Sequence, residues 1–177
     1  MAGAMAKRRK DHVDAIVEQW AQERPDLDTA ALALFGRLFR AVQLADEALS
    51  RGLRGYELPR GGFDILAALR RAGVPYELNP TELMGATLVS SGGMTKQLDR
   101  LAQAGMVERR PDPADRRGTR VRLTQRGKAT IDEAIETHIG NEGRLLASLS
   151  SEERARLDRL LRTLLDGLER VGAGPAA

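Results

Sequence analysis

A basic segment from Met94 to Lys128 holds the side chains of this chain that are best suited to bind a partner. The segment contains ten basic and four acidic residues, so its net charge is +6, whereas the whole chain of 177 residues carries +3. The remaining residues therefore sum to −3. A positive patch on a body of opposite net charge predicts a polyanionic partner that docks on one face.

The pattern within residues 91–104 predicts a helix that can present part of this charge to DNA. At 100° per residue, Met94, Leu98 and Leu101 fall on one narrow face, which must pack on the protein. The opposite face begins with small residues and then carries hydrogen-bonding and cationic groups, as entry into the major groove requires. The alternative is an ordinary surface helix. The residues of this helix and its start that we expect to contact DNA are Ser90, Ser91, Gly92, Thr95, Lys96 and Arg100.

A hairpin with basic residues at its tip is predicted directly after this helix. Residues 106–110 and 119–124 show the alternation of β-strands, and the stretch between them is rich in turn-forming residues. The tip carries Arg116 and Arg117, and arginine is the side chain best suited to a narrow, electronegative minor groove. Asp115 could hold one guanidinium in a bidentate pair and so aim the other. We therefore expect Arg116 and Arg117 to contact DNA; the alternative is a charged turn that only faces solvent.

Helices must position this basic surface. Aromatic residues make up only 3% of the chain, so the core has to be built mainly from Leu, Ala, Val and Ile. Asn79, Pro80 and Glu82 give the strongest start signal, a capping box with proline at the first helical position. Helical spacing of apolar residues predicts helices over 11–23, 30–53 (long and mostly buried), 62–72 (with Phe63, Leu66, Ala67 and Leu69 inward), 80–87, 125–147 and 151–171.

The types and spacing of the reactive side chains argue against catalysis and metal binding. The chain has no cysteine, which excludes disulfides, thiolate metal sites and thiol oxidation sensing. His12 and His138 have no carboxylate partners at metal-ligand spacing. Ser90 and Ser91 have no histidine nearby, and the glycines beside them do not form a phosphate-binding loop. We therefore predict no enzyme activity, no catalytic residue, no metal and no cofactor.

The distribution of apolar residues gives no sign of a membrane segment. No apolar run is long enough to span a bilayer, and none follows the basic residues Lys7 to Lys10 as it would in a signal peptide. We expect residues 1–9 to form a flexible basic arm. The chain is thus predicted to be cytoplasmic, with no membrane partner.

The segment around the hairpin resembles a known family. The sequence reads LDRL at 98–101, GMVER at 105–109, DPADRR at 112–117 and VRLT at 121–124. With this spacing it is similar to the MarR winged-helix repressors, and the resemblance covers nearly the whole chain. It implies a mainly α fold with a small β-wing, in which a winged helix-turn-helix DNA-binding domain joins a helical dimerisation region formed by the N- and C-terminal helices.

The resemblance also implies a homodimer whose first and last helices interlock. Such a dimer presents two winged helices to a pseudo-palindromic DNA operator. The leucine-rich terminal helices agree with this, because their apolar faces exceed what one small domain needs to bury itself. The expected division is a flexible basic N-terminus (1–9), a helical dimerisation region (10–58 and 125–171), the winged helix-turn-helix domain (59–124) and a disordered tail (172–177).

The opening helix adds a resemblance to one branch of that family, the one that contains PecS and the urate-responsive regulators. This branch has an added N-terminal helix and binds a small anionic ligand such as urate, which lowers DNA affinity. The resemblance assigns Trp20, Asp64 and Arg109 to the ligand site, together with Gln97, which stands where the branch has arginine. Glutamine cannot neutralise an anion as arginine does, so a less charged aromatic ligand, or no ligand, is an alternative.

Three of these four positions also have a purely structural explanation. Trp20 can anchor the first helix, and Asp64 suits the first turn of its helix because of the helix dipole. Arg109 can simply belong to the basic strand of the hairpin.

The sequence therefore predicts a homodimeric, sequence-specific transcriptional regulator, most simply a repressor, whose partners are an operator DNA and a possible small effector. Two other functions fit the same features. A non-specific architectural DNA protein would share the basic face but bind scrambled duplexes equally well. A winged-helix module for protein interaction would leave its leucine-rich helices available to another protein.

Overall fold

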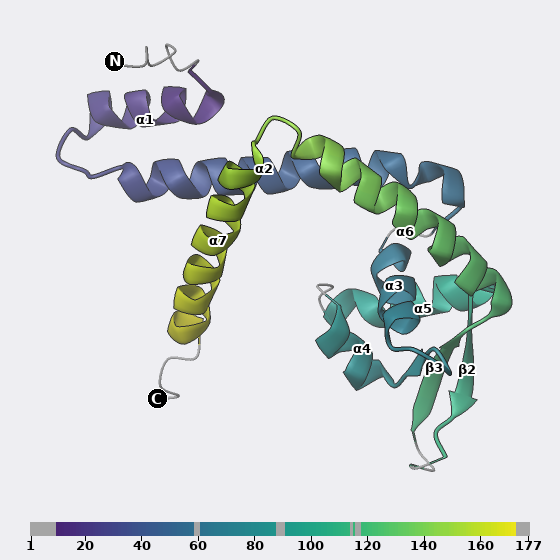
Figure 1. Cartoon of the computed structure of the whole chain (residues 1–177). Helices are drawn as coiled ribbons and strands as arrows, with labels where there is room; N and C mark the ends of the chain where they lie inside the picture. The colour runs from purple at the N-terminus through teal and green to yellow at the C-terminus, as the bar shows by residue number, and fades with distance from the viewer. Residues whose placement is uncertain (1–9, 59–60, 88–90, 114, 116–117, 173–177) are drawn as a thin grey trace, which may run out of the picture. The chain divides into compact units, whose positions relative to one another are not determined.

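The computed structural model describes residues 10–58, 61–87, 91–113, 115 and 118–172 (Figure 1). The chain divides into two compact units, one ending at Ser50 and one beginning at Arg51. The sequence predictions for residues 1–9, Ser90, Arg116, Arg117 and 173–177 lie outside the described residues. Within the described part of the chain, no helix combines the length and the hydropathy needed to cross a membrane.

The first unit pairs helix α1 (His12–Glu23) with most of helix α2 (Ala30–Gly52). Asp11 caps α1, since its carboxylate accepts hydrogen bonds from the backbone N–H groups of Val13 and Asp14. Val13 is the buried residue of α1 and lies against Gly36, where an added Cβ would come within 3.1 Å of Val13 Cγ1. The small residue therefore lets the two helices approach closely.

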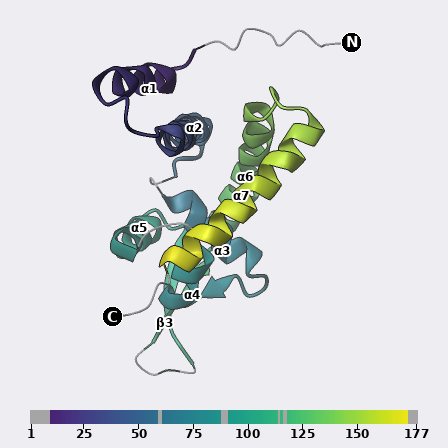
Figure 2. The same cartoon turned by 90° about the vertical axis from the view of Figure 1, so that its left-hand side faces the viewer.

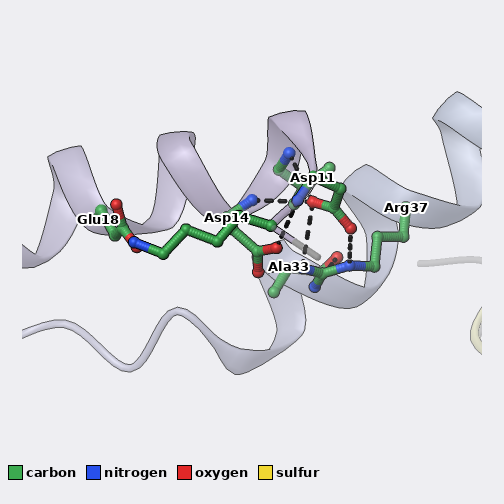
Figure 3. Close-up of polar contacts among 7 residues, drawn as sticks. Asp11, Asp14, Glu18, Ala33 and Arg37 are labelled. Carbon is green, nitrogen blue, oxygen red and sulfur yellow. Dashed lines mark hydrogen bonds and ion pairs between the residues drawn. The ribbon is translucent and has the colours of Figure 1, made fainter. Parts of the chain in front are cut away.

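An ion-pair cluster holds the start of α1 on α2 (Figure 3). The Arg37 guanidinium donates to Asp11 Oδ2 at 2.7 Å, to the Asp14 carboxylate and to the carbonyl of Ala33. Arg37 lowers the pKa of the Asp11 carboxyl, chiefly through this hydrogen bond. The Asp11 side chain thus both caps α1 and forms an ion pair with Arg37.

Helix α2 corrects one prediction. It was expected to be mostly buried, yet it contains no buried residue, and the side chains of Leu34, Phe39 and Val42 are 61%, 68% and 60% exposed. An apolar sequence predicts burial only if something covers it, and α1 packs on a different side of α2, at Gly36. Helix α1 therefore leaves the apolar face of α2 exposed.

The second unit is built around a small antiparallel sheet with strand order β1-β3-β2. Figure 2 shows α3, α4 and α5 beside the β2–β3 hairpin, and the same helices contribute to one core with the strands. After the short 3-10 turn Arg54–Tyr56, the elements are α3 (Gly62–Arg71), β1 (Glu77–Leu78), α4 (Pro80–Ala86), α5 (Ser91–Gln103), β2 (Val107–Pro111), β3 (Thr119–Leu123), α6 (Gln125–Leu145) and α7 (Ser151–Gly172).

The predicted helix starts are confirmed. Asn79 and Glu82 form the capping box of α4, with Glu82 N–H donating to Asn79 Oδ1 at 2.9 Å. Thr124 caps α6 by accepting from Gly127 N–H at 3.0 Å, and Ser150 and Glu153 form the reciprocal pair at the start of α7. These starts are local in sequence, which is why they could be predicted.

Three details differ from the predictions. Strand β1 was not predicted, since two residues carry no pattern and only their pairing with β3 makes them a strand. In α3, Leu66 and Leu69 are buried as expected, and Gly62, Ile65 and Ala68 are buried as well, whereas Phe63 and Ala67 are only half-buried. Gly172 is the last residue of α7 and not the first of a tail.

Candidate nucleic-acid interface

Helix α5 packs on the core of the second unit through the apolar face that its sequence predicts. Met94, Leu98 and Leu101 are 3%, 3% and 0% exposed and belong to the core of the second unit. Thr95 and Lys96 are exposed on the other side. Arg100 is exposed one turn further along. Through these three side chains the helix offers a hydroxyl and two cations to a partner, while its apolar stripe is buried. Of the predicted contacts at its start, Ser91 and Gly92 lie in the first turn of α5.

Ion pairs within the chain divide the basic residues of segment 94–128 into two groups. Arg109 pairs with Asp99 at 2.7 Å, and Arg110 pairs with Glu108 at 2.7 Å. The paired cations are partly neutralised before any DNA arrives. In the part of the chain that the structure describes, Lys96, Arg100 and Arg122 have no ion pair and keep their full charge for a partner.

Lys128 also belongs to the neutralised group. Its Nζ lies 2.7 Å from Asp132 Oδ2, while Arg70 Nε lies 2.6 Å from the other oxygen of the same carboxylate. Both cations also stand over the ring of Tyr76, at 5.8 and 5.0 Å from its centroid. The hydrogen bonds from Lys128 and then from Arg70 lower the pKa of Asp132, so this carboxylate stays charged and keeps both cations engaged.

The wing is a regular two-stranded ribbon up to its tip. Strands β2 and β3 pair from Val107 opposite Leu123 to Pro111 opposite Thr119. The loop beyond them is closed by Asp112 N–H donating to the carbonyl of Gly118 at 3.0 Å. The paired strands and this hydrogen bond therefore fix the two ends of the loop at the tip of the wing.

The residues predicted to bind a ligand come from both units, and two of those in the second unit, Asp64 and Arg109, line different hollows. Trp20 lies on α1 in the first unit and is 42% exposed. Asp64 lies in the first turn of α3 and lines a hollow of about 240 Å³ with Arg71 and residues 85–87. Arg109 lines a different hollow of about 390 Å³ between α4, α5 and the wing, whose other lining residues are Pro80, Met84, Met94, Thr95, Leu98, Thr119 and Val121.

Gln97 has an environment of its own. It is half-buried on α5, and its side-chain amide lies so close to Gly61 that an added Cβ there would be 2.6 Å from Gln97 Nε2. Gly61 also has a positive φ of 76°, a backbone conformation that favours glycine. Among the described residues, the buried Oε1 atom of Gln97 has no hydrogen-bond partner. Burial without a partner costs free energy and marks the atom as a potential acceptor.

The described residues contain no group of three or more histidine and carboxylate side chains that could hold a metal ion. His138 stacks on Phe63 with ring centroids 4.3 Å apart, and its Nε2 lies 3.3 Å from Glu142. This histidine therefore belongs to the packing between α3 and α6.

Comparison with known proteins identifies the family. The family model described as MarR family matches residues 56–118, which span α3 to the wing. The regulator PecS of Dickeya dadantii is 42% identical over 149 residues, covering 84% of this chain and 90% of that protein. A mutant MarR of Escherichia coli, solved in complex with operator DNA, is 30% identical, with a TM-score of 0.67 over 82% of this chain and 97% of the other.

A third similar structure is BpsR of Bordetella bronchiseptica, whose DNA binding is regulated by 6-hydroxynicotinic acid. It is 26% identical, with a TM-score of 0.67 over 74% of this chain and 91% of the other. The identity to PecS extends over both units, and the fold matches proteins of the same type. The chain therefore belongs to the MarR family of winged helix-turn-helix transcriptional regulators.

Proposed function

We propose that this MarR-family regulator is a homodimeric, sequence-specific repressor that acts on operator DNA in the cytoplasm by binding alone, without a catalytic step. One observation supports this most directly. Helix α5 buries Met94, Leu98 and Leu101 completely and exposes Lys96 and Arg100, so it is held rigidly with its cations outward. A relative with the same fold binds operator DNA.

In this proposal α5 enters the major groove and the wing reaches the minor groove. The DNA contacts are Ser90, Ser91, Gly92, Thr95, Lys96 and Arg100 from the recognition helix and its start, and Arg116 and Arg117 from the wing. Residues 59–124 form the DNA-binding domain. Residues 10–58 and 125–171 form the dimerisation region. The exposed apolar side chains of α2 and α7 support the second assignment, because Phe39, Leu160 and Leu165 are 68%, 59% and 55% exposed in the single chain.

The wing contact is tested with Arg117→Ala. We expect operator affinity to fall about tenfold or more, because one minor-groove arginine is lost. Fluorescence anisotropy with a footprinted operator measures it. Arg156→Ala on α7 is the control, since it removes the same charge from an exposed position far along the chain from α5 and the wing. Equal affinities for the two variants would contradict the wing model, and equal affinity for a scrambled duplex would favour an architectural DNA protein.

We further propose that a small aromatic acid or urate-like effector releases the DNA, with Trp20, Asp64, Gln97 and Arg109 as its contacts. The similarity to PecS supports this, and so does BpsR, which responds to 6-hydroxynicotinic acid. The observation that favours a ligand in this chain is the buried Gln97 oxygen without a partner. Such an acceptor suits an N–H or O–H donor on the ligand better than a bare anion.

A thermal-shift panel of urate, xanthine and aromatic acids tests the effector proposal. We expect the native protein to be stabilised by a ligand that carries a donor, and Gln97→Arg to gain a response to urate, because the arginine supplies the missing charge. Gln103→Arg, on the exposed side of the same helix, is the matched control and should gain nothing. No response by the native protein or by Gln97→Arg to any member of the panel would contradict an effector site at these residues.

A further inference from the structure

Arg120 on β3 lies in an unfavourable position for a cation unless it is neutralised. In the register of the wing it stands directly opposite Arg110 of β2. Like charges in directly opposed positions of an antiparallel pair repel. Arg110 is offset by Glu108 on its own strand, at 2.7 Å. Arg120 is offset by carboxylates from other parts of the fold.

Three carboxylates surround the Arg120 guanidinium. Its Nε donates to Glu77 Oε1 at 3.3 Å, and its Nη1 donates to Asp112 Oδ2 at 3.4 Å and lies 3.8 Å from Glu82 Oε2. The side chains of Arg120 and Asp112 are only 24% and 10% exposed. Networks of several partly buried charges hold geometry better than isolated surface pairs do.

The three carboxylates come from three separate segments, each of which is itself anchored. Glu77 belongs to β1, which pairs with β3. Glu82 is held in the capping box of α4, where its Oε2 accepts from Asn79 N–H at 2.7 Å. Asp112 begins the loop at the wing tip and is tied across it to Gly118. Arg120 therefore links the wing, the edge strand and the first helix of the helix-turn-helix.

We propose that Arg120 is a positioning residue for DNA recognition, which sets the wing against α4 and thereby against α5 without touching DNA itself. The charge of the cluster supports this assignment. The Arg120 guanidinium is already engaged by three carboxylates, and their negative charge disfavours a phosphate at the same group. The inference rests on the proposed binding of operator DNA.

The salt dependence of binding separates positioning from contact. A residue that contacts phosphate lowers the slope of log affinity against log salt by about one when it is removed, whereas a positioning residue leaves the slope unchanged. For Arg120→Met we expect operator affinity to fall about tenfold with the native slope. The ratio of operator to scrambled-duplex affinity should fall as well, because only the specific complex needs both the wing and α5 in place.

Two variants serve as references in the same titrations. Arg122→Met removes an arginine from the same strand and the same face of the sheet, at a position without an ion pair to any described residue, and should leave the operator-to-scrambled ratio close to native. Lys96→Ala removes a proposed DNA contact and should reduce the slope. Thermal unfolding of each variant establishes that the fold is retained, and Arg120→Lys, which can still satisfy one carboxylate, should restore part of the affinity.

Two results would overturn the inference. A reduced salt slope for Arg120→Met would make Arg120 a phosphate contact, and native operator affinity in both Arg120→Met and Arg120→Lys would show that the wing needs no such brace. Failure of the native protein to bind any footprinted operator would instead contradict the proposed function itself. If Arg120→Met does not fold, the comparison of native protein with Arg120→Lys decides by the same two criteria.

Discussion

Gly127→Ala is expected to lower the free energy of unfolding by roughly 3 kcal/mol, since a Cβ at this position would overlap backbone that cannot move aside. Built on Gly127, the Cβ would overlap the carbonyl oxygen of Met106 and lie 2.8 Å from its carbonyl carbon. That oxygen already accepts a hydrogen bond from Thr124 N–H at 3.1 Å. The start of α6 is therefore docked on the turn that joins α5 to the wing, with no space for a methyl group.

Urea denaturation followed by circular dichroism measures this effect. Gly140→Ala is the control on the same helix, because nothing lies within 4 Å of a Cβ there. It should leave the stability unchanged or raise it by up to about 1 kcal/mol, as alanine does in open helical positions. If the two variants were equally stable, the close docking of α6 on Met106 would be refuted.

Removing both exposed cations of the recognition helix is expected to have the largest effect on DNA binding. For Lys96→Ala combined with Arg100→Ala, we expect operator affinity to fall about 100-fold, at roughly tenfold for each lost contact. The slope of log affinity against log salt should fall by about one to two, depending on whether both side chains meet phosphates. Neither residue has an ion pair within the described chain, so stability should change little.

Anisotropy titrations over a series of salt concentrations give both quantities. The control is Arg156→Ala combined with Arg159→Ala on α7, which removes the same charge from a helix outside the proposed DNA-binding domain. Sedimentation of both double variants checks that the oligomeric state is kept. A double variant of α5 with native affinity and slope would exclude this helix as the DNA-binding element.

Contacts between residues close in sequence explain most of what could be predicted. Asn79 and Glu82 are three residues apart, and their capping box exists wherever a helix starts between them. Met94, Leu98 and Leu101 repeat at helical spacing, so their common face follows from the helix alone. The exposed positions of Thr95, Lys96 and Arg100 then follow from the same geometry.

Contacts between residues distant in sequence explain what could not be predicted. Glu77 and Arg120 are 43 residues apart, and only the pairing of β1 with β3 makes them neighbours. Asp99 lies on α5 and Arg109 on β2, and the fold brings them together. Their ion pair removes one cation from the predicted basic surface. A count of charges along the chain cannot show which of them are already neutralised.

The predicted ligand residues show the same limit. A resemblance to a family branch can name Asp64, Gln97 and Arg109, but it does not predict which residues surround each of them in the fold. In this chain Asp64 and Arg109 line different hollows, and Gln97 lies against Gly61. Their role as one effector site is therefore a proposal, which the thermal-shift panel tests.

The sequence by itself determined the helices, the wing, the seating of α5 and the family, because periodicity, capping and motif spacing are local properties. The tertiary structure decided which cations remain available, and it brought Arg120 to three carboxylates and Gly127 to the Met106 carbonyl. It also showed that α1 leaves the apolar face of α2 exposed. These are long-range properties, since burial, ion pairing and steric fit depend on which distant segments the fold places together.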